Sequence, residues 1–303
     1  MAPPAPLFDR YVIVDWSANA TPKLGRDSVW IQVADRSGDV APPLNLATRA
    51  AARQFLTEVL TASTGERVLV GFDMPYGYPS GFARAIGLTD DPPWRATWDH
   101  LAAEVVDDAT NANNRFAVAT ACNAAIGDGP GPFWATTSVR HVTPWLARTK
   151  APGFPHGALA EHRHAELALR ARGLRPASVW QLAGAGSVGS QTLVGIPVVH
   201  ALRWHPSLAE RSVVWPFETG LVPDPTGGRA DAIVHAEIWP TWAGPPDPAR
   251  HPVRDAAQVA GLADHLRTLD DAGELAPLFA PSLDASAAHA VVAEEGWVLG
   301  ATP

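Results

Sequence analysis

Two buried strands that each end in an aspartate are the feature that most constrains the fold of this chain. The apolar, β-branched run 11–15 ends at Asp15. A second such run, 68–73, ends at Asp73, and between the two runs residues 48–64 carry apolar side chains at helical spacing. Two strands joined by a crossover helix are expected to lie parallel and adjacent. Both aspartates then emerge at the carboxyl edge of the sheet, where α/β proteins commonly build their sites.

The remaining pattern predicts a single α/β domain. Segment 28–34 alternates in polarity and precedes a turn at 35–39, which predicts a hairpin, and a short strand or sheet edge is expected after Val40. Further strands are expected at 178–180, 213–215 and 232–239, and helices at 91–108, 158–172, 255–269 and 285–294. We therefore predict a mixed sheet flanked by helices, with a core over about 8–80 and 177–303 and a largely helical insertion over about 81–176.

Composition places the chain among globular proteins. It has 303 residues, 47% of them hydrophobic and 18% charged, and no apolar run approaches the roughly 18 residues of a membrane span. The Pro/Ala-rich start lacks the basic residues and apolar stretch of a secretory signal, so we expect a cytoplasmic protein with no membrane partner. A single cysteine, Cys122, excludes an internal disulfide and a zinc ribbon. Any metal would be held by oxygen or imidazole ligands.

Net charge limits the class of partner. The formal value of −8 argues against broad, sequence-independent binding to duplex nucleic acid, which requires the neutralisation of many phosphates. A local basic groove or a small phosphorylated substrate is compatible with it. The sequence leaves the oligomeric state open.

Four acidic residues stand where this fold could bring them together. Asp15 and Asp73 end strands, Glu237 lies in a late strand and Asp255 opens a helix. Mg²⁺ and Mn²⁺ prefer hard oxygen ligands, and two such ions about 4 Å apart can position a water and stabilise the leaving oxygen in phosphodiester cleavage. The structural alternative is that the strand-end aspartates are turn residues and that Asp255 only stabilises a helix N-terminus.

Residues 184–189 match the dinucleotide-binding pattern G-x-G-x-x-G. The helix that should follow is expected to be interrupted at 195–197, which weakens that interpretation. We favour a Gly-rich turn close to the site, in which backbone N–H groups near Gly186 could bind a phosphate.

Other polar residues are candidates for contacts with substrate. His162 and Glu166 stand four apart at helical spacing, which suits a metal or phosphate clamp and equally a solvated helix face. The predicted substrate contacts are Ser17, Asn114, Arg115, Arg163, Glu166 and Gly186. Four tryptophans lie beside these segments, where they could stack on bases or, more commonly, pack in the core: Trp16, Trp134, Trp180 and Trp239.

Four segments in order along the chain resemble one family. VIVDWS at 12–17, GFDMPYGYP at 71–79, HAEIWP at 235–240 and EGWV at 295–298 are similar to a bacterial family of unknown function whose members are predicted to be RNase H-like nucleases. The resemblance implies a ribonuclease H-like fold, with Asp15 and Asp73 matching its first-strand and fourth-strand aspartates. It implies a third metal ligand from a C-terminal helix, which we match to Asp255, with Asp284 as the alternative. Glu237 matches the strand glutamate of the family.

The leading hypothesis is a hydrolase of phosphodiester bonds, most simply a nuclease, that depends on Mg²⁺ or Mn²⁺. Asp15, Asp73 and Asp255 would hold metal, and Glu237 would ligate it or orient the attacking water. One alternative keeps the site but acts on a small nucleotide or a phosphorylated cofactor precursor, such as one of molybdopterin synthesis. Another is a non-catalytic RNase H-like module that binds a nucleotide or a protein. A dinucleotide-dependent oxidoreductase is the remaining possibility.

Overall fold

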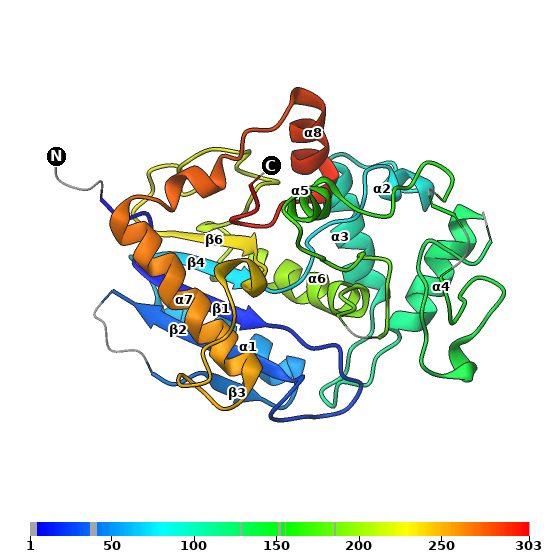
Figure 1. Cartoon of the computed structure of the whole chain (residues 1–303), viewed down its shortest axis with the longest axis horizontal. Coiled ribbons are helices and arrows are strands. Elements are labelled where there is room, and N and C mark those ends of the chain that lie inside the picture. The colour runs from blue at the N-terminus through cyan, green and yellow to red at the C-terminus, as the bar shows by residue number, and fades with distance from the viewer. Residues whose placement is uncertain are drawn as a thin grey trace.

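The computed structural model describes residues 5–36, 41–127, 129–150, 153–154, 156–184 and 186–302. This part of the chain forms a six-stranded mixed sheet flanked by helices (Figure 1). Its strands are β1 (Arg10–Asp15), β2 (Val29–Asp35), β3 (Leu44–Leu46), β4 (Arg67–Phe72), β5 (Ser212–Val214) and β6 (Ala232–Glu237). Its α-helices are α1 (Arg49–Ala62), α2 (Phe82–Ala85), α3 (Pro93–Glu104), α4 (Arg115–Ile126), α5 (His164–Ala171), α6 (Gly189–Arg203), α7 (Arg254–Ala272) and α8 (Ala285–Ala290).

The strand order is β3-β2-β1-β4-β6-β5. The first three strands pair antiparallel, whereas β4, β6 and β5 continue parallel to β1. The predicted parallel pairing of the two aspartate-ending strands is confirmed. Phe72 of β4 lies opposite both Val14 of β1 and Glu237 of β6. The carboxyl ends of three neighbouring strands therefore meet at one edge of the sheet.

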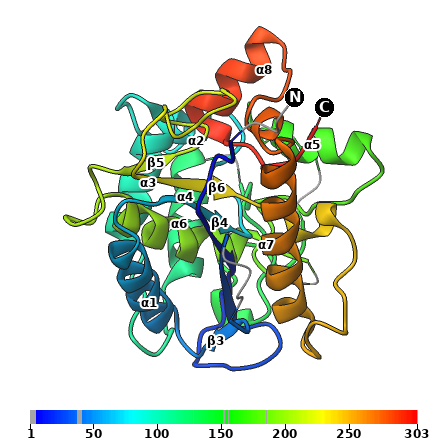
Figure 2. The same cartoon turned by 90° about the vertical axis from the view of Figure 1, so that its left-hand side faces the viewer.

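Successive side chains of each strand point to opposite faces of the sheet, so the core is divided into one cluster on each face. On β1, Val12 and Val14 pack with the α1 and α6 side chains, whereas Tyr11 and Ile13 pack with α7. Seen edge-on in Figure 2, the sheet has α1 on one side and α7 on the other. Thr48 caps α1, because its side chain accepts a hydrogen bond from Ala51 N. These layers fix the strand ends against helices on both faces.

The predicted insertion packs on the same core as the sheet. Apolar side chains of α3 and α4 belong to one continuous cluster with those of β1 and β4. Four rings, Tyr78, Phe82, Phe133 and Trp180, pack on one another with centroids 4.4–5.9 Å apart. Two of the four tryptophans beside the motifs, Trp16 and Trp180, are fully buried core residues, whereas Trp134 and Trp239 are half-buried.

Three predictions about local structure are wrong. Segment 178–180 forms a turn rather than a strand, since Trp180 is drawn into the aromatic cluster and its indole N–H donates to Ala160 O. Helix α5 begins only at His164, so His162 lies outside it and does not share a helix face with Glu166. Helix α6 runs unbroken through Pro197, because burial of ten of its 15 residues outweighs the poor helix propensity. The hairpin turn at 35–39 lies mostly outside the described residues.

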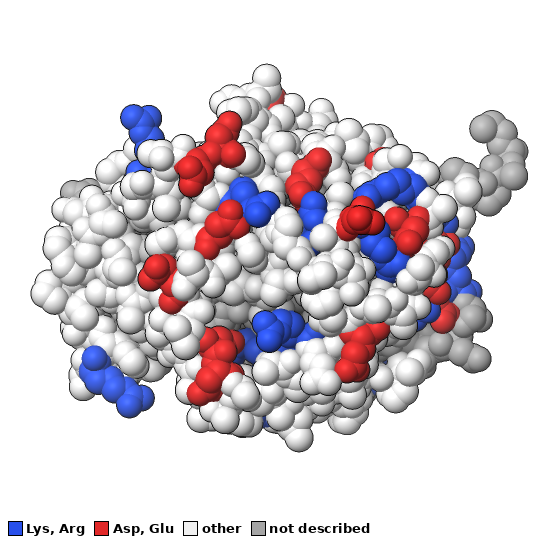
Figure 3. Space-filling model, turned by 180° about the vertical axis from the view of Figure 1, so that it is seen from behind, with Lys and Arg blue, Asp and Glu red and all other residues white. Residues whose placement is uncertain are grey.

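Surface properties agree with the composition. None of the described helices is both long and apolar enough to cross a membrane. Figure 3 shows one face of the molecule, on which acidic and basic side chains are interspersed and no extended basic band is seen.

Candidate functional site

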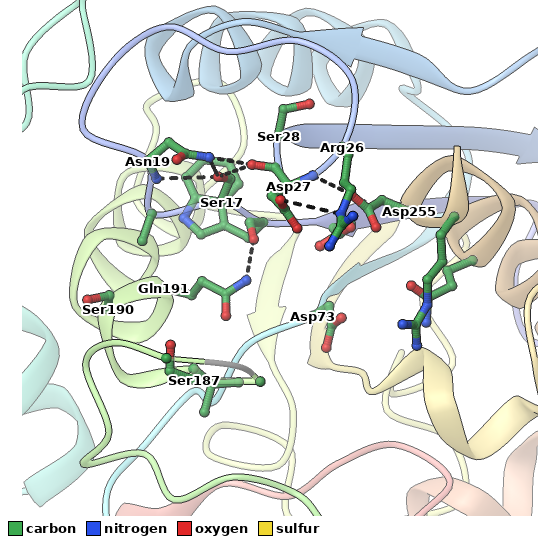
Figure 4. Close-up of a pocket in the computed structure, with 18 of the residues that line it drawn as sticks. Ser17, Asn19, Arg26, Asp27, Ser28, Asp73, Ser187, Ser190, Gln191 and Asp255 are labelled. Atoms are coloured by element: carbon green, nitrogen blue, oxygen red, sulfur yellow. Dashed lines mark hydrogen bonds and ion pairs between the residues drawn. The ribbon is translucent and has the colours of Figure 1, made fainter. Parts of the chain in front are cut away.

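A cleft of about 960 Å³ lies at the carboxyl ends of β1 and β4 (Figure 4). Its walls come from the β1–β2 loop, the segment before α6, the start of α7 and the residues after β6. Of the predicted site residues it is lined by Asp15, Asp73, Asp255, Ser17, Arg115 and Gly186. The structure thus brings together three of the four predicted acids and three of the six predicted substrate contacts.

Asp15 and Asp73 are neighbours because their strands are. The Asp73 backbone N–H donates to Val14 O at 2.9 Å, one residue before Asp15. Neither carboxylate has a hydrogen-bond or ion-pair partner among the described residues. Burial raises the pKa of Asp73 to about 7, and the carboxylates of Glu237 and Asp255 contribute. Burial likewise raises the pKa of Asp15 well above its usual range, with Asp73 and Asp255 adding to the effect.

Asp255 faces the same cleft from the first turn of α7. Its Oδ2 accepts a hydrogen bond from the backbone N–H of Asp27 at 2.7 Å, which ties the β1–β2 loop to the helix. The alternative third ligand, Asp284, is the N-cap of α8, where its side chain accepts from Ala287 N. The structure therefore favours Asp255 over Asp284 as the acid that accompanies the strand-end pair.

The donor chemistry fits a hard divalent cation, although the acids do not form a closed cage. No three His, Cys, Asp or Glu side chains within the described ranges are grouped so that they could hold a metal ion by themselves. Mg²⁺ usually binds through one or two carboxylates, several waters and substrate phosphate oxygens rather than a dedicated protein cage. Asp15 and Asp73 supply such a pair, and within the described chain neither forms an ion pair, the positive charge that acts on Asp15 being that of Arg254. Asp255 accepts from Asp27 N through Oδ2 alone, so its Oδ1 is available to join them.

Arg115 brings a cation to the far side of the cleft. Its Nε donates to Ser190 Oγ at 2.9 Å and its NH1 to Asn113 Oδ1 at 2.7 Å, and its guanidinium lies 4.5 Å from the centroid of the Phe116 ring. No carboxylate of the described chain lies within ion-pair distance of it. Burial, reinforced by Arg49, lowers the pKa of Arg115 to about 10, so it stays charged at neutral pH. An oriented, unpaired guanidinium is suited to binding a phosphate.

The glycine-rich segment leads into the N-terminus of α6, which also lines the cleft. Gly186 adopts a positive φ of 71°, and α6 begins at Gly189 with no side-chain cap. A helix N-terminus carries free N–H groups and partial positive charge, so it attracts anions. Segment 178–180 is not a strand, and the strand–turn–helix context of a dinucleotide fingerprint is therefore missing. The arrangement supports a phosphate-facing turn.

Glu237, Arg163 and Glu166 form a buried network outside the cleft. The Arg163 guanidinium donates to Glu237 Oε1 and Oε2 at 2.6 and 2.8 Å and to Glu166 Oε1 at 2.5 Å. Glu237 also accepts from Tyr76 N at 2.9 Å. Burial raises the pKa of Glu237, while Arg163 opposes the shift. With both carboxylate oxygens engaged, Glu237 holds the chain after β4 in place and influences Asp73 only through its charge.

The other predicted contacts have local structural partners. Ser17 Oγ lies at the cleft but donates to Asp27 O at 3.0 Å, which closes the β1–β2 loop. Asn114 precedes α4, and its amide bridges Val106 N and Glu104 O outside the cleft. Sequence reasoning missed several polar residues that do line the cleft, among them Arg26, Gln191 and Arg254. Arg254 adjoins a predicted acid, and this was the one signal that could have identified it.

Comparisons of the chain with family models, curated proteins and solved structures give no match. Its function is therefore inferred from the residues of the site.

Proposed function

We propose that this protein is a divalent-metal-dependent hydrolase of phosphodiester bonds with a ribonuclease H-like fold, most simply a nuclease. The observation that carries the proposal is the pair Asp15 and Asp73. Two partly buried carboxylates without a cationic partner in the described chain lie at the ends of adjacent parallel strands, in a large cleft. Such a pair is costly to keep charged unless a cation accompanies it.

The strand arrangement supports the same proposal. Three antiparallel strands are followed by a crossover helix and a parallel strand beside the first, as the family resemblance implies. Asp15 and Asp73 occupy the matching strand ends, and Asp255 comes from a helix late in the chain.

Each part of the cleft has a distinct role in this proposal. Asp15 and Asp73 would hold Mg²⁺ or Mn²⁺, with Asp255 completing or orienting the set. When bound, the metal polarises the phosphodiester and lowers the pKa of water. Arg115 and the N-terminus of α6 face the acids across the cleft and would bind and orient the phosphate. Glu237 and Arg163 fix the chain that carries Asp73.

Thermal unfolding with EDTA, Mg²⁺ or Mn²⁺, followed by a nuclease assay, tests this proposal. Metal should raise the unfolding midpoint of the wild type and enable cleavage of a single-stranded oligonucleotide. Asp15→Asn and Asp73→Asn should lose both effects. Asp90→Asn, which changes an exposed aspartate that does not line the cleft, should lose neither. Undiminished cleavage in Asp73→Asn would refute the proposed site. Absence of any metal response would favour a non-catalytic binding module.

A small nucleotide or phosphorylated cofactor precursor is the second candidate substrate. It is favoured by the net charge of −8, since a polymer needs an extended run of phosphate contacts. Thermal protection distinguishes the two candidates. An oligonucleotide should protect a nuclease in proportion to ligand concentration over Kd, whereas a mononucleotide should protect an enzyme for small substrates.

A further inference from the structure

A second cavity of about 200 Å³ opens beside the cleft, on the other side of Asp73. It shares four lining residues with the cleft: Asp73, Gly186, Val188 and Trp239. The two spaces are therefore adjacent at the residue proposed to hold metal. A phosphate bound at Asp73 would place the group attached to it at the mouth of this side cavity.

The side cavity differs from the cleft in chemistry. Its walls are largely apolar and come from Met74 and Pro75 after β4, Pro176 and Ala177 after α5, and Ile238 after β6. The half-buried Trp239 adds an aromatic face at the junction with the cleft. Apolar walls with one aromatic side chain suit a flat heteroaromatic ring. Stacking on the tryptophan stabilises binding of such a ring whichever base it belongs to.

Some of the lining residues are polar. Of these, Glu166 and Glu237 both accept hydrogen bonds from Arg163, which neutralises their charge. Thr241 adds a hydroxyl. Arg175 lies exposed at the rim without an ion-pair partner in the described chain. The cavity volume of about 200 Å³ is room for one base and not for a base pair.

We infer that the side cavity receives one unpaired nucleobase of a substrate whose phosphate lies at Asp15 and Asp73. The inference rests on the proposed function and specifies its substrate class as a nucleotide unit that is not base-paired at this position. A duplex would have to release the base before the phosphate could reach the acids. A polymer and a mononucleotide both satisfy this requirement.

Binding measurements with and without the base test the inference. Adenosine 5′- and 3′-monophosphate are compared with ribose 5-phosphate by calorimetry on the full chain with Mg²⁺. At least one adenosine monophosphate should bind at least fivefold more tightly than ribose 5-phosphate, the lower end of what stacking one base supplies. Ala177→Phe, which places a bulky side chain in the cavity from a loop, should bring this ratio of affinities close to one and leave ribose 5-phosphate binding unchanged. Trp239→Ala should reduce the ratio.

Ala249→Phe is the matched control, because it adds the same bulk at an exposed loop position that lines neither cavity. It should keep the wild-type ratio. Equal binding of all three compounds to the wild type, or a ratio that survives in Ala177→Phe, would overturn the side-cavity assignment. The proposed function would then still stand if metal-dependent cleavage requires Asp73. If none of the compounds binds and metal has no effect, both proposals are wrong.

Discussion

Arg163 and Glu237 form a two-point ion pair inside the protein, with NH2 to Oε1 at 2.6 Å and NH1 to Oε2 at 2.8 Å. Arg163 also donates to the Glu295 backbone carbonyl at 2.7 Å, so it joins the end of β6 to the segment that follows α8. The pair lies beside Asp73, and its polar atoms are engaged with each other and with neighbouring backbone and Glu166. Its contribution is to position the strand end that carries the site.

Arg163→Met should destabilise the fold strongly. The substitution leaves Glu166 and Glu237 buried and without a counter-charge, and breaking such a pair costs about 3–5 kcal/mol. Urea unfolding followed by tryptophan fluorescence measures the loss. Lys150→Met, which removes a more exposed ion pair with Glu161, should cost less than about 1 kcal/mol. Similar losses in the two variants would contradict the structural role given to Arg163.

The elements that carry the site could be predicted because their signals are local. Strands β1 and β4 are apolar runs of the correct length, and α1 and α7 show helical spacing with a cap or an acid in the first turn. Asp15 and Asp73 follow directly, since residues that end parallel strands share an edge of the sheet. The failure at 178–180 has a tertiary cause, because the apolar side chains there fill an aromatic cluster.

Glu237 and Arg163 show what the sequence could not reveal. Glu237 belongs to a motif segment and Arg163 to none, and only the folded chain brings their side chains together and removes them from solvent. The same holds for Gly77 of segment 71–79. A Cβ there would lie 2.6 Å from the backbone O of Glu295, so the segments 71–79 and 295–298 are packed against each other. Part of the family resemblance therefore records packing rather than chemistry.

Stability should fall as the pH decreases below neutral because of His235. Burial, with a smaller effect of Arg203, lowers the pKa of His235 to about 3, and neither ring nitrogen has a hydrogen-bond partner among the described residues. Since the unfolded chain binds this proton near pH 6.5 and the folded chain does not, stability is lost between pH 7 and pH 3. The loss from this residue should be about 2 kcal/mol between pH 7 and 5.

His235→Leu should reduce the slope of the unfolding free energy against pH, as measured by urea unfolding at pH 5, 6 and 7. The exposed His289, changed to Asn, serves as the control and should leave the slope as in the wild type. An unchanged slope in His235→Leu would mean that other groups determine the pH dependence.

Asp73→Asn should stabilise the metal-free protein while it abolishes activity. Without a cation, the carboxylates of Asp73, Asp15 and Asp255 repel one another in a poorly solvated cleft. Removing one charge at pH 8 in EDTA should raise the free energy of unfolding by on the order of 1–2 kcal/mol, as is common where stability has been traded for function. Asp90→Asn should have no such effect. Lower stability of Asp73→Asn would show that the carboxylate serves the fold.

Gly195→Ala should be destabilising even though alanine favours helices. An added Cβ would lie 1.9 Å from Met74 Sδ and 3.0 Å from Trp16 Cδ1, and these residues directly follow Asp73 and Asp15. Overpacking of this kind costs about 1–3 kcal/mol, more than the helix propensity gained.

Gly261→Ala in α7 provides the matched control, since nothing lies within 4 Å of its added Cβ. Urea unfolding should show a gain of up to about 1 kcal/mol for this variant and a loss for Gly195→Ala. Metal-dependent hydrolysis should fall in Gly195→Ala alone, by up to about 100-fold, because the displaced chain segments carry both strand-end acids and a shift of about 1 Å can have that effect. Full activity in Gly195→Ala would mean that α6 does not set the positions of Asp15 and Asp73.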